Sequence, residues 1–245
     1  MADRIAVVTG ASGTLGTALV RLLARRGLAV LAVSRSGNSP NAGEVASIAA
    51  DLGSDDATSI IRRALPAGEL AMAVHGIGLP GAPGVMQVDP AMLAAAVDLK
   101  AGGFLRLIHA VEDRLGQHSR LVAIGGHLGI EPSEHAPLAG VANAALANLV
   151  RQLVRPIGAR GSTVHLVAPG PFDSPRVDAL IAAKAAGEGI SVDDMRAQML
   201  ADYPAGAMPT ADDVAGVIID LLAPHADAQH GSTLFLDAGA RRGIF

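Results

Sequence analysis

Three glycines at positions 10, 13 and 16 form the clearest chemical motif of the chain. They lie in Thr9–Gly16, between a short β-branched run, Ile5–Val8, and a stretch with the apolar spacing of a helix. Glycines at such a turn permit a tight bend and let backbone N–H groups approach a pyrophosphate at the positive end of the helix. The spacing and position therefore predict a dinucleotide-binding turn.

Histidines supply side chains that titrate near neutral pH. His75, His127 and His135 each fall in a turn or loop that we expect at the ligand edge of the fold. Any of the three is a candidate acid or base, with Asp98 or Glu134 placed to orient one. A loop histidine that is solvated or bonded to backbone fits the sequence as well. No close spacing of His and acidic residues predicts a metal site.

The sequence contains few other side chains that could take part in catalysis. The 245 residues include no Cys, no Trp, one Tyr (Tyr203) and two Lys (Lys100 and Lys184) beside 17 Arg. The lack of thiols excludes disulfides, a thiolate nucleophile and Cys-ligated zinc. A mechanism that needs a Tyr or a Lys has only these three residues to draw on.

Seven apolar runs alternate with helical stretches along the chain. The runs cover 5–8, 28–33, 45–50, 70–74, 121–124, 163–167 and 233–236, and helical patterns follow the glycine turn and lie near 55–65, 90–115, 138–158 and 210–222. Parallel strands need crossovers, so the alternation predicts an α/β fold: a Rossmann-type, doubly wound, seven-stranded parallel sheet with helices on both faces. The length and the lack of a linker or repeat indicate a single domain over 1–245.

The segment 171–209 precedes the last predicted helix and strand. It contains Gly187 and Gly189, a predicted N-cap at Ser191, and Pro204 near its end. We interpret it as a helical excursion that serves as a lid at the ligand edge, or as a packed surface pair of helices.

The chain resembles the short-chain dehydrogenase/reductase (SDR) family over nearly its whole length. Thr9–Gly16 (TGASGTLG) is similar to the family's cofactor turn, although position 14, often Gly in the family, is Thr. Pro169–Ser174 (PGPFDS) resembles its Pro-Gly segment, and Gly231–Gly239 its closing strand. The resemblance implies a nicotinamide cofactor, with contacts at Thr9, Gly10, Ser12, Gly13, Leu15, Gly16, Gly76, Pro169 and Gly170.

The end of the second predicted strand contains Arg35. An acidic residue there would bind the adenosine ribose 2′-hydroxyl, whereas an arginine pairs with a 2′-phosphate, so the sequence favours NADP(H) over NAD(H). The resemblance assigns the adenine contact to Asp51 and Leu52. Only nine residues, Ser36–Glu44, separate Arg35 from the third strand, too few for the helix that the family usually carries there.

The residues with which the family transfers protons are replaced at the positions that the resemblance assigns. Its Ser, Tyr, Lys and Asn fall on Gly126, Ala139, Asn143 and Asp98. No other register restores the Tyr-Lys pair, because the only Tyr is Tyr203 and no Lys lies between 100 and 184. Tyr203 has no Lys four residues on, so His127, His135 and Asp98 are the candidate catalytic residues.

Three functions fit these features. The first is an SDR-like NADP(H)-dependent oxidoreductase with an atypical proton donor, acting on a small carbonyl, imine or enone. The second is a catalytically silent nucleotide-binding protein, either a sensor or the inactive subunit of a hetero-oligomer with an active homologue. The third is a non-redox lyase or isomerase with His127 or His135 as base. The glycine turn predicts nucleotide binding in all three.

The charge balance bears on partners. A net charge of −4 and a pI near 6.0 argue against nucleic-acid and anionic-membrane partners, because such binding needs a clustered basic surface. The amino-terminal run is too short to span a bilayer and lacks a signal-peptide layout, so we expect a cytoplasmic protein.

Two helical stretches carry Ala and Leu on more than one face, near 90–115 and 138–158, as helices with a second partner do. By resemblance they form the interface of a homodimer or homotetramer. The loop Leu79–Gly84 and the segment 171–209 would line a mostly apolar pocket for a small-molecule substrate.

Overall fold

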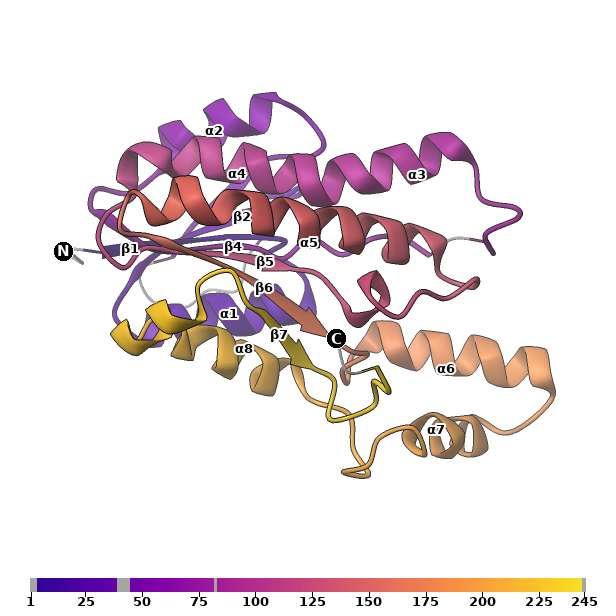
Figure 1. Cartoon of the computed structure of the whole chain (residues 1–245). Helices are drawn as coiled ribbons and strands as arrows, with labels where there is room; N and C mark the ends of the chain where they lie inside the picture. Colours follow the sequence, from indigo (N-terminus) through magenta and orange to yellow (C-terminus); the bar gives the residue numbers. More distant parts are fainter. Residues whose placement is uncertain (1–3, 39–44, 82, 244–245) are drawn as a thin grey trace.

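The computed structural model describes residues 4–38, 45–81 and 83–243. Its centre is a sheet of seven parallel strands in the order β3-β2-β1-β4-β5-β6-β7 (Figure 1). The strands are β1 (Arg4–Thr9), β2 (Ala29–Ser34), β3 (Val45–Ala49), β4 (Glu69–His75), β5 (Arg120–Ile124), β6 (Thr163–Pro169) and β7 (Thr233–Leu236). The strand order reverses between β1 and β4, as in a doubly wound sheet, so the predicted Rossmann-type fold is confirmed.

Helices cover both faces of this sheet. They are α1 (Thr14–Arg25), α2 (Asp56–Ala64), α3 (Pro90–Val97), α4 (Gly103–Val111), α5 (Pro137–Gly158), α6 (Pro175–Glu188), α7 (Val192–Leu200) and α8 (Ala211–Asp220). Figure 1 shows α1 and α8 on one face and α2, α4 and α5 on the other. Along β1, Ile5 and Val7 join the core that includes α4, whereas Ala6 and Val8 join the core that includes α1. The central strands β1, β2 and β4 are mostly apolar on both sides because both of their faces are buried, whereas the edge strand β3 is largely exposed.

The stretch near 90–115 differs from its predicted form. The sequence predicts one helix, but a π-helical turn at Asp98–Gly102 separates α3 from α4. A Cβ on Gly102 would overlap the Asp98 carboxylate, and a Cβ on Gly103 would lie 2.9 Å from His75 Cε1. The glycine pair therefore lets the helix pack tightly on the end of β4, and the wider turn changes the phase of its side chains.

Two helices, α6 and α7, extend beyond the carboxyl edge of the sheet (Figure 1). They enclose a small apolar cluster of their own, made by Val177, Ile181, Ala185 and Met195. The Ser191 side chain accepts a hydrogen bond from Asp194 N, which confirms the predicted N-cap. The excursion is thus a packed helical pair beside the edge where the strands end.

Two segments interpreted from the sequence lie partly outside the described residues. They are the short connection Ser36–Glu44, of which residues 39–44 are not described, and the predicted pocket loop Leu79–Gly84, of which residue 82 is not described. Within the three described ranges, no helix is both long and apolar enough to cross a membrane.

Candidate active site

The turn between β1 and α1 depends on its glycines. Gly10 has φ +72°, and a Cβ there would lie 2.5 Å from the Gly76 carbonyl oxygen at the end of β4. A Cβ on Gly16 would overlap the carbonyl oxygen of Gly10. Both positions require glycine because the backbone folds back on itself and on the neighbouring strand.

The first turn of α1 is open to an anion. Gly13 is the N-cap residue, has an extended backbone, and provides no side chain to cap the helix. Ser12, Gly13 and Thr14 are exposed. The N–H groups that begin a helix are therefore available, at the positive end of the helix dipole, to a ligand with phosphate oxygens. This geometry fits a dinucleotide pyrophosphate.

The neighbouring strand ends present one cation and one carboxylate. Arg35 is exposed just after β2 and makes no ion pair within the described part of the chain. Asp51 is exposed after β3, and its Oδ1 accepts a hydrogen bond from Gly53 N at 3.0 Å. The Leu52 side chain is buried beside it. Within the described residues, no carboxylate pairs with Arg35, and Gly53 N is the hydrogen-bond donor to the Asp51 carboxylate.

His75 is a buried structural residue. Its Nε2 lies 3.1 Å from the Leu99 carbonyl oxygen and therefore donates, which leaves Nδ1 to accept from the Thr9 hydroxyl at 3.0 Å. Burial, with a smaller contribution from the charge of Lys100, lowers the pKa of His75 to about 3. His75 thus stays neutral and ties the ends of β1 and β4 to the π turn. This corrects the expectation that it is available as an acid or base.

The three candidate catalytic residues lie in different surroundings. His127 begins a short helical turn after β5, and its Nδ1 is 3.7 Å from the position of a Cβ on Gly170. His135 is exposed in a loop, where its Nε2 lies 3.5 Å from Glu134 Oε1. Asp98 forms a two-pronged ion pair with Arg106, with both N–O distances 3.0 Å. Among them only His127 is shown beside the Pro-Gly segment.

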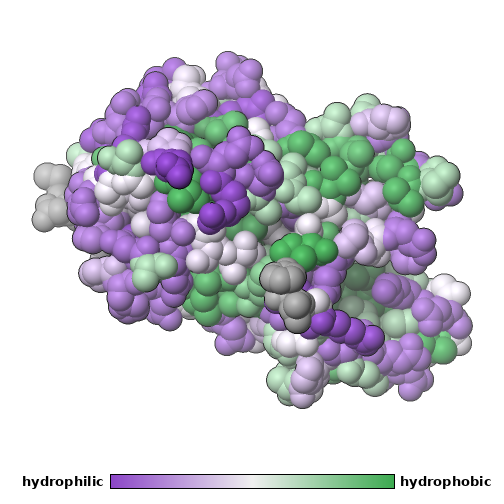
Figure 2. Space-filling view, in the orientation of Figure 1, coloured by the Kyte–Doolittle hydropathy of each residue, from purple (hydrophilic) through white to green (hydrophobic). Residues whose placement is uncertain are grey.

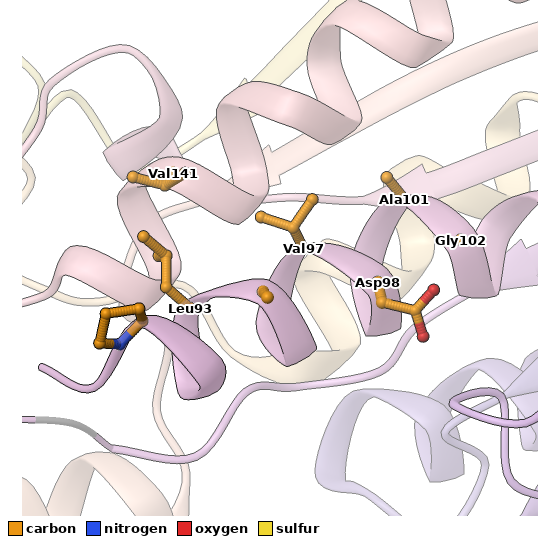
Figure 3. Close-up of a pocket in the computed structure, with 8 residues that line it drawn as sticks. Leu93, Val97, Asp98, Ala101, Gly102 and Val141 are labelled. Atoms are coloured by element: carbon orange, nitrogen blue, oxygen red, sulfur yellow. The ribbon is translucent and has the colours of Figure 1, made fainter.

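Asp98 also borders a groove on the outer helical face (Figure 3). This groove has a volume of about 600 Å³ and is lined by Pro90, Leu93, Ala94, Val97, Asp98, Ala101, Gly102 and Val141. Apart from the Asp98 carboxylate its side chains are apolar. The groove lies between α3 and α5, so its chemistry suits contact with another apolar surface.

A second hollow lies between the excursion and the carboxyl-terminal residues. It has a volume of about 480 Å³ and is lined by His127, Glu131, Pro171, Lys184, Met199, Asp202, Tyr203, Asp237, Ala240, Arg241 and Arg242. The Tyr203 hydroxyl donates to the Pro171 carbonyl oxygen at 3.1 Å. Burial, then the charges of Asp237 and Asp202, raise the pKa of Tyr203. The only tyrosine is therefore bonded to backbone and holds its proton strongly.

The start of α5 carries no acidic side chain at the two positions that the resemblance assigns to the family's Tyr and Lys. Ala139 has no functional group, and Asn143 is buried with its Nδ2 2.8 Å from the position of a Cβ on Gly126. Asn143 Oδ1 is buried and has no hydrogen-bond partner among the described residues. A polar acceptor is therefore left unpartnered close to the end of β5.

Lys100 lies at the same edge of the sheet, where the sequence had not placed it. Its side chain is buried, and Nζ donates to the Ile124 carbonyl oxygen, at the end of β5, at 2.8 Å. Burial, followed by the charge of Arg176, lowers the pKa of Lys100 to about 8. Lys100 is one of only two lysines in the sequence. The orientation of its side chain depends on the π turn, which the apolar pattern of the sequence does not predict.

The described residues contain no cluster of three or more His, Cys, Asp or Glu side chains able to hold a metal ion. The candidate site consists instead of a glycine turn, an arginine without an ion pair among the described residues, and polar groups at the ends of β4, β5 and β6.

Comparison with known proteins agrees with this geometry. Residues 10–241 match the family model described as enoyl-(acyl carrier protein) reductase. The chain is 27% identical over 251 residues to the 3-oxoacyl-(acyl-carrier-protein) reductase FabG of Escherichia coli strain K12, covering 96% of both chains. It is 30% identical over 255 residues to cis-4-hydroxycyclohexanecarboxylate dehydrogenase of Sinomonas cyclohexanicum, covering 97% of this chain and 96% of that protein.

Solved structures show the same fold. A short chain dehydrogenase family protein from Francisella tularensis superposes with a TM-score of 0.89 at 20% identity, covering 98% of this chain and 99% of that one. An actinorhodin polyketide ketoreductase variant with NADPH gives a TM-score of 0.86 at 20% identity, with the same coverages. The family match over almost the entire chain, together with the sheet order and the glycine turn, shows that this protein belongs to the short-chain dehydrogenase/reductase family of NAD(P)-dependent oxidoreductases.

Proposed function

We propose that the protein is an NADP(H)-dependent oxidoreductase that reduces a small carbonyl, imine or enone with a proton donor other than a Tyr-Lys pair. The observation that carries this proposal is the uncapped amino terminus of α1 at the same sheet edge as Arg35, which has no ion pair with any residue that the structure describes. The first feature suits a pyrophosphate, and the second suits a 2′-phosphate. The bound cofactor supplies the hydride.

The cofactor contacts follow from the same edge of the sheet. Pyrophosphate would lie against the turn formed by Thr9, Gly10, Ser12, Gly13, Leu15 and Gly16. Arg35 would bind the 2′-phosphate, while Asp51 and Leu52 would face the adenine. Gly76, Pro169 and Gly170 would flank the nicotinamide. Two structural relatives support the preference for NADPH, since one was solved with NADPH and another, YwfH, is an NADPH-dependent reductase of bacilysin biosynthesis.

The surroundings of the three candidate residues argue against His135 and Asp98 as the proton donor. His135 is exposed, and Asp98 is paired with Arg106. His127 lies between the Pro-Gly segment and the hollow under the excursion. We therefore assign His127 to the wall of the substrate pocket, with α6 and α7 as its lid.

One observation favours a second function, a nucleotide-binding protein without redox activity. The start of α5 offers only Ala139 and Asn143, and Tyr203 is bonded to backbone, so none of these residues is a poised acid. A silent subunit paired with an active homologue would have the same features.

Turnover distinguishes the two functions. Purified protein is mixed with NADPH and, in turn, ethyl acetoacetate, cyclohexanone, 2-cyclohexenone and 1-pyrroline, and the loss of NADPH absorbance is followed. We expect NADPH oxidation with at least one of these classes, accompanied by the reduced product. Binding of NADPH without oxidation in every case would favour the silent nucleotide-binding protein.

A further inference from the structure

Lys100 lies where the ends of two central strands meet. It belongs to the π turn between α3 and α4, and its Nζ donates to the carbonyl oxygen of Ile124, the last residue of β5. The neighbouring residue in the π turn, Leu99, accepts a hydrogen bond from His75, the last residue of β4. Lys100 is therefore placed at the carboxyl ends of β4 and β5, the edge at which doubly wound sheets bind ligands.

The lysine is buried, and no carboxylate among the described residues pairs with it. Its relative exposure is 5%, and its Nζ donates to a neutral carbonyl oxygen. The nearest acidic neighbour in sequence, Asp98, is paired with Arg106. A buried ammonium without a counter-ion is destabilising, so packing alone is a poor reason for a lysine at this position.

The groups that face Lys100 are neutral or positive. His75 on β4 is neutral, and Arg176 at the start of α6 adds a positive charge. Arg176 Nη1 lies 3.4 Å from the position of a Cβ on Gly78, so the guanidinium reaches the loop that follows β4. Burial and Arg176 together lower the pKa of Lys100 to about 8, which suits a group that must release a proton near neutral pH.

A second observation comes from α5. Asn143 Oδ1 is buried and has no hydrogen-bond partner among the described residues, and the Asn143 side chain adjoins Gly126, two residues beyond the carbonyl that Lys100 binds. A Cβ on Gly126 would lie 2.8 Å from Asn143 Nδ2, so glycine at this position lets the Asn143 amide pack against the end of β5. The end of β5 therefore combines a buried ammonium with a buried acceptor oxygen for which the described residues supply no donor, as expected beside a polar ligand atom.

We propose that Lys100 is the proton donor of the reaction, a proposal that rests on the proposed function. A bound nicotinamide would supply the hydride to the carbonyl carbon, and the π electrons would pass to the carbonyl oxygen. Lys100 Nζ would give a proton to that oxygen and become a neutral amine, and water would return the proton to Lys100. The net products would be an alcohol and the oxidised cofactor.

Substitutions at Lys100 test this role. Lys100→Met keeps the length of the side chain and removes the ammonium, and we expect kcat to fall about 10²- to 10⁴-fold. Lys100→Ala leaves space that methylamine fits, and we expect added methylamine to restore kcat at least tenfold. Arg63→Met, on the exposed surface of α2, is the matched control for loss of a charge. The folding of each variant is checked by circular dichroism.

The pH profile separates proton donation from packing. Wild-type kcat for reduction should fall above a pH of about 8, where Lys100 loses its proton, whereas the residual rate of Lys100→Met should lack this fall. Lysine labelled with ¹³C at the ε position gives signals from only two lysines, and Lys184→Met leaves that of Lys100 for assignment. Its signal should titrate with a midpoint near 8.

The outcomes distinguish this proposal from the proposed function. A Lys100→Met variant within threefold of wild-type kcat would overturn the donor role alone, as would a lack of methylamine rescue together with an unchanged pH profile. If wild-type protein fails to oxidise NADPH with every substrate class, the oxidoreductase function falls and the donor role falls with it.

Discussion

The guanidinium of Arg35 is exposed at the end of β2 and has no ion pair in the described part of the chain. A charge-assisted contact with a phosphate contributes roughly 1.5–3 kcal/mol, so Arg35→Ala should weaken NADPH binding about 10- to 100-fold. NADH has no 2′-phosphate, and its affinity should change little. Fluorescence titration of both cofactors measures the two effects, with Arg63→Ala as a control for loss of surface charge. Equal weakening of NADPH and NADH would contradict this role.

His75 gives the fold a pH dependence of predictable sign. Its pKa is about 3 in the folded protein and 6.5 in an unfolded chain, so between these values the unfolded chain binds more protons. The free energy of unfolding should therefore decrease as the pH falls below 6.5, by up to about 1.4 kcal/mol per pH unit from this residue. Above 6.5 the histidine is neutral in both states and its contribution is constant.

Denaturant unfolding from pH 7 to pH 4.5 tests this expectation against His75→Gln. The glutamine variant retains a donor and an acceptor but does not titrate, so its stability should decline less steeply with falling pH. A constant offset between the variants is immaterial because the slope is compared. Identical slopes would show that His75 binds protons equally in the folded and unfolded states.

Individual residues mark the limit of what the sequence could predict. The glycine spacing predicted the turn because local backbone geometry imposes it. The roles of His75 and Lys100 were not predictable in this way, since both depend on burial and on a π turn that brings distant segments together. Tyr203 was recognised as the only tyrosine, but its bond to Pro171 depends on how the excursion packs.

At the scale of elements, we expect the glycines of the β1–α1 turn to have two different roles: Gly16 is needed for the fold, and Gly13 is needed for nucleotide binding. A Cβ on Gly16 would overlap the Gly10 carbonyl oxygen, so Gly16→Ala should destabilise the fold by roughly 1–3 kcal/mol and reduce NADPH binding. A Cβ on Gly13 would lie 3.3 Å from the same oxygen but otherwise face open space. Gly13→Ala should therefore fold normally and weaken NADPH binding by crowding the pyrophosphate.

Thermal unfolding measures the effect of these variants on stability, and NADPH titration measures their effect on nucleotide binding. Gly187→Ala is the matched control, because a Cβ there meets nothing within 4 Å and lies in the last turn of α6. It should raise stability slightly, since alanine favours helix. If Gly13→Ala binds NADPH as wild type does, the pyrophosphate does not lie at this turn.

The elements were predictable to different degrees. All seven strands were anticipated, the central ones because strands buried on both faces appear as continuous apolar runs, and the edge strands β3 and β7 from their alternation with helical stretches. The stretch 90–115 was expected to form one helix, since its apolar pattern runs through the break. The π turn packs against His75 through Gly103, and Gly102 accommodates the Asp98 carboxylate within the turn; a pattern of periodicity does not contain these approaches.

At the scale of the whole molecule, apolar side chains gather over α3 and the adjoining end of α5 (Figure 2). Met92 and Val141 are exposed there, beside the groove of Figure 3. We propose that this surface joins two copies of the chain in a homodimer or homotetramer. Val141→Glu places a charge in the groove and should shift the protein towards a 24.6 kDa monomer.

Light scattering coupled to size exclusion measures this shift. Leu180→Glu is a matched control, because Leu180 is similarly exposed but lies on α6, away from the groove. Its oligomeric state should match that of wild type. A wild-type protein that elutes as a monomer would contradict the proposed interface.

The central claim is that the β1–α1 turn and Arg35 bind NADP(H). Its most direct test is a titration of the purified wild-type protein with NADPH and with NADH, following cofactor fluorescence. We expect saturable binding of both cofactors, at least tenfold tighter for NADPH. No binding of either cofactor at millimolar concentration, or tighter binding of NADH, would contradict it.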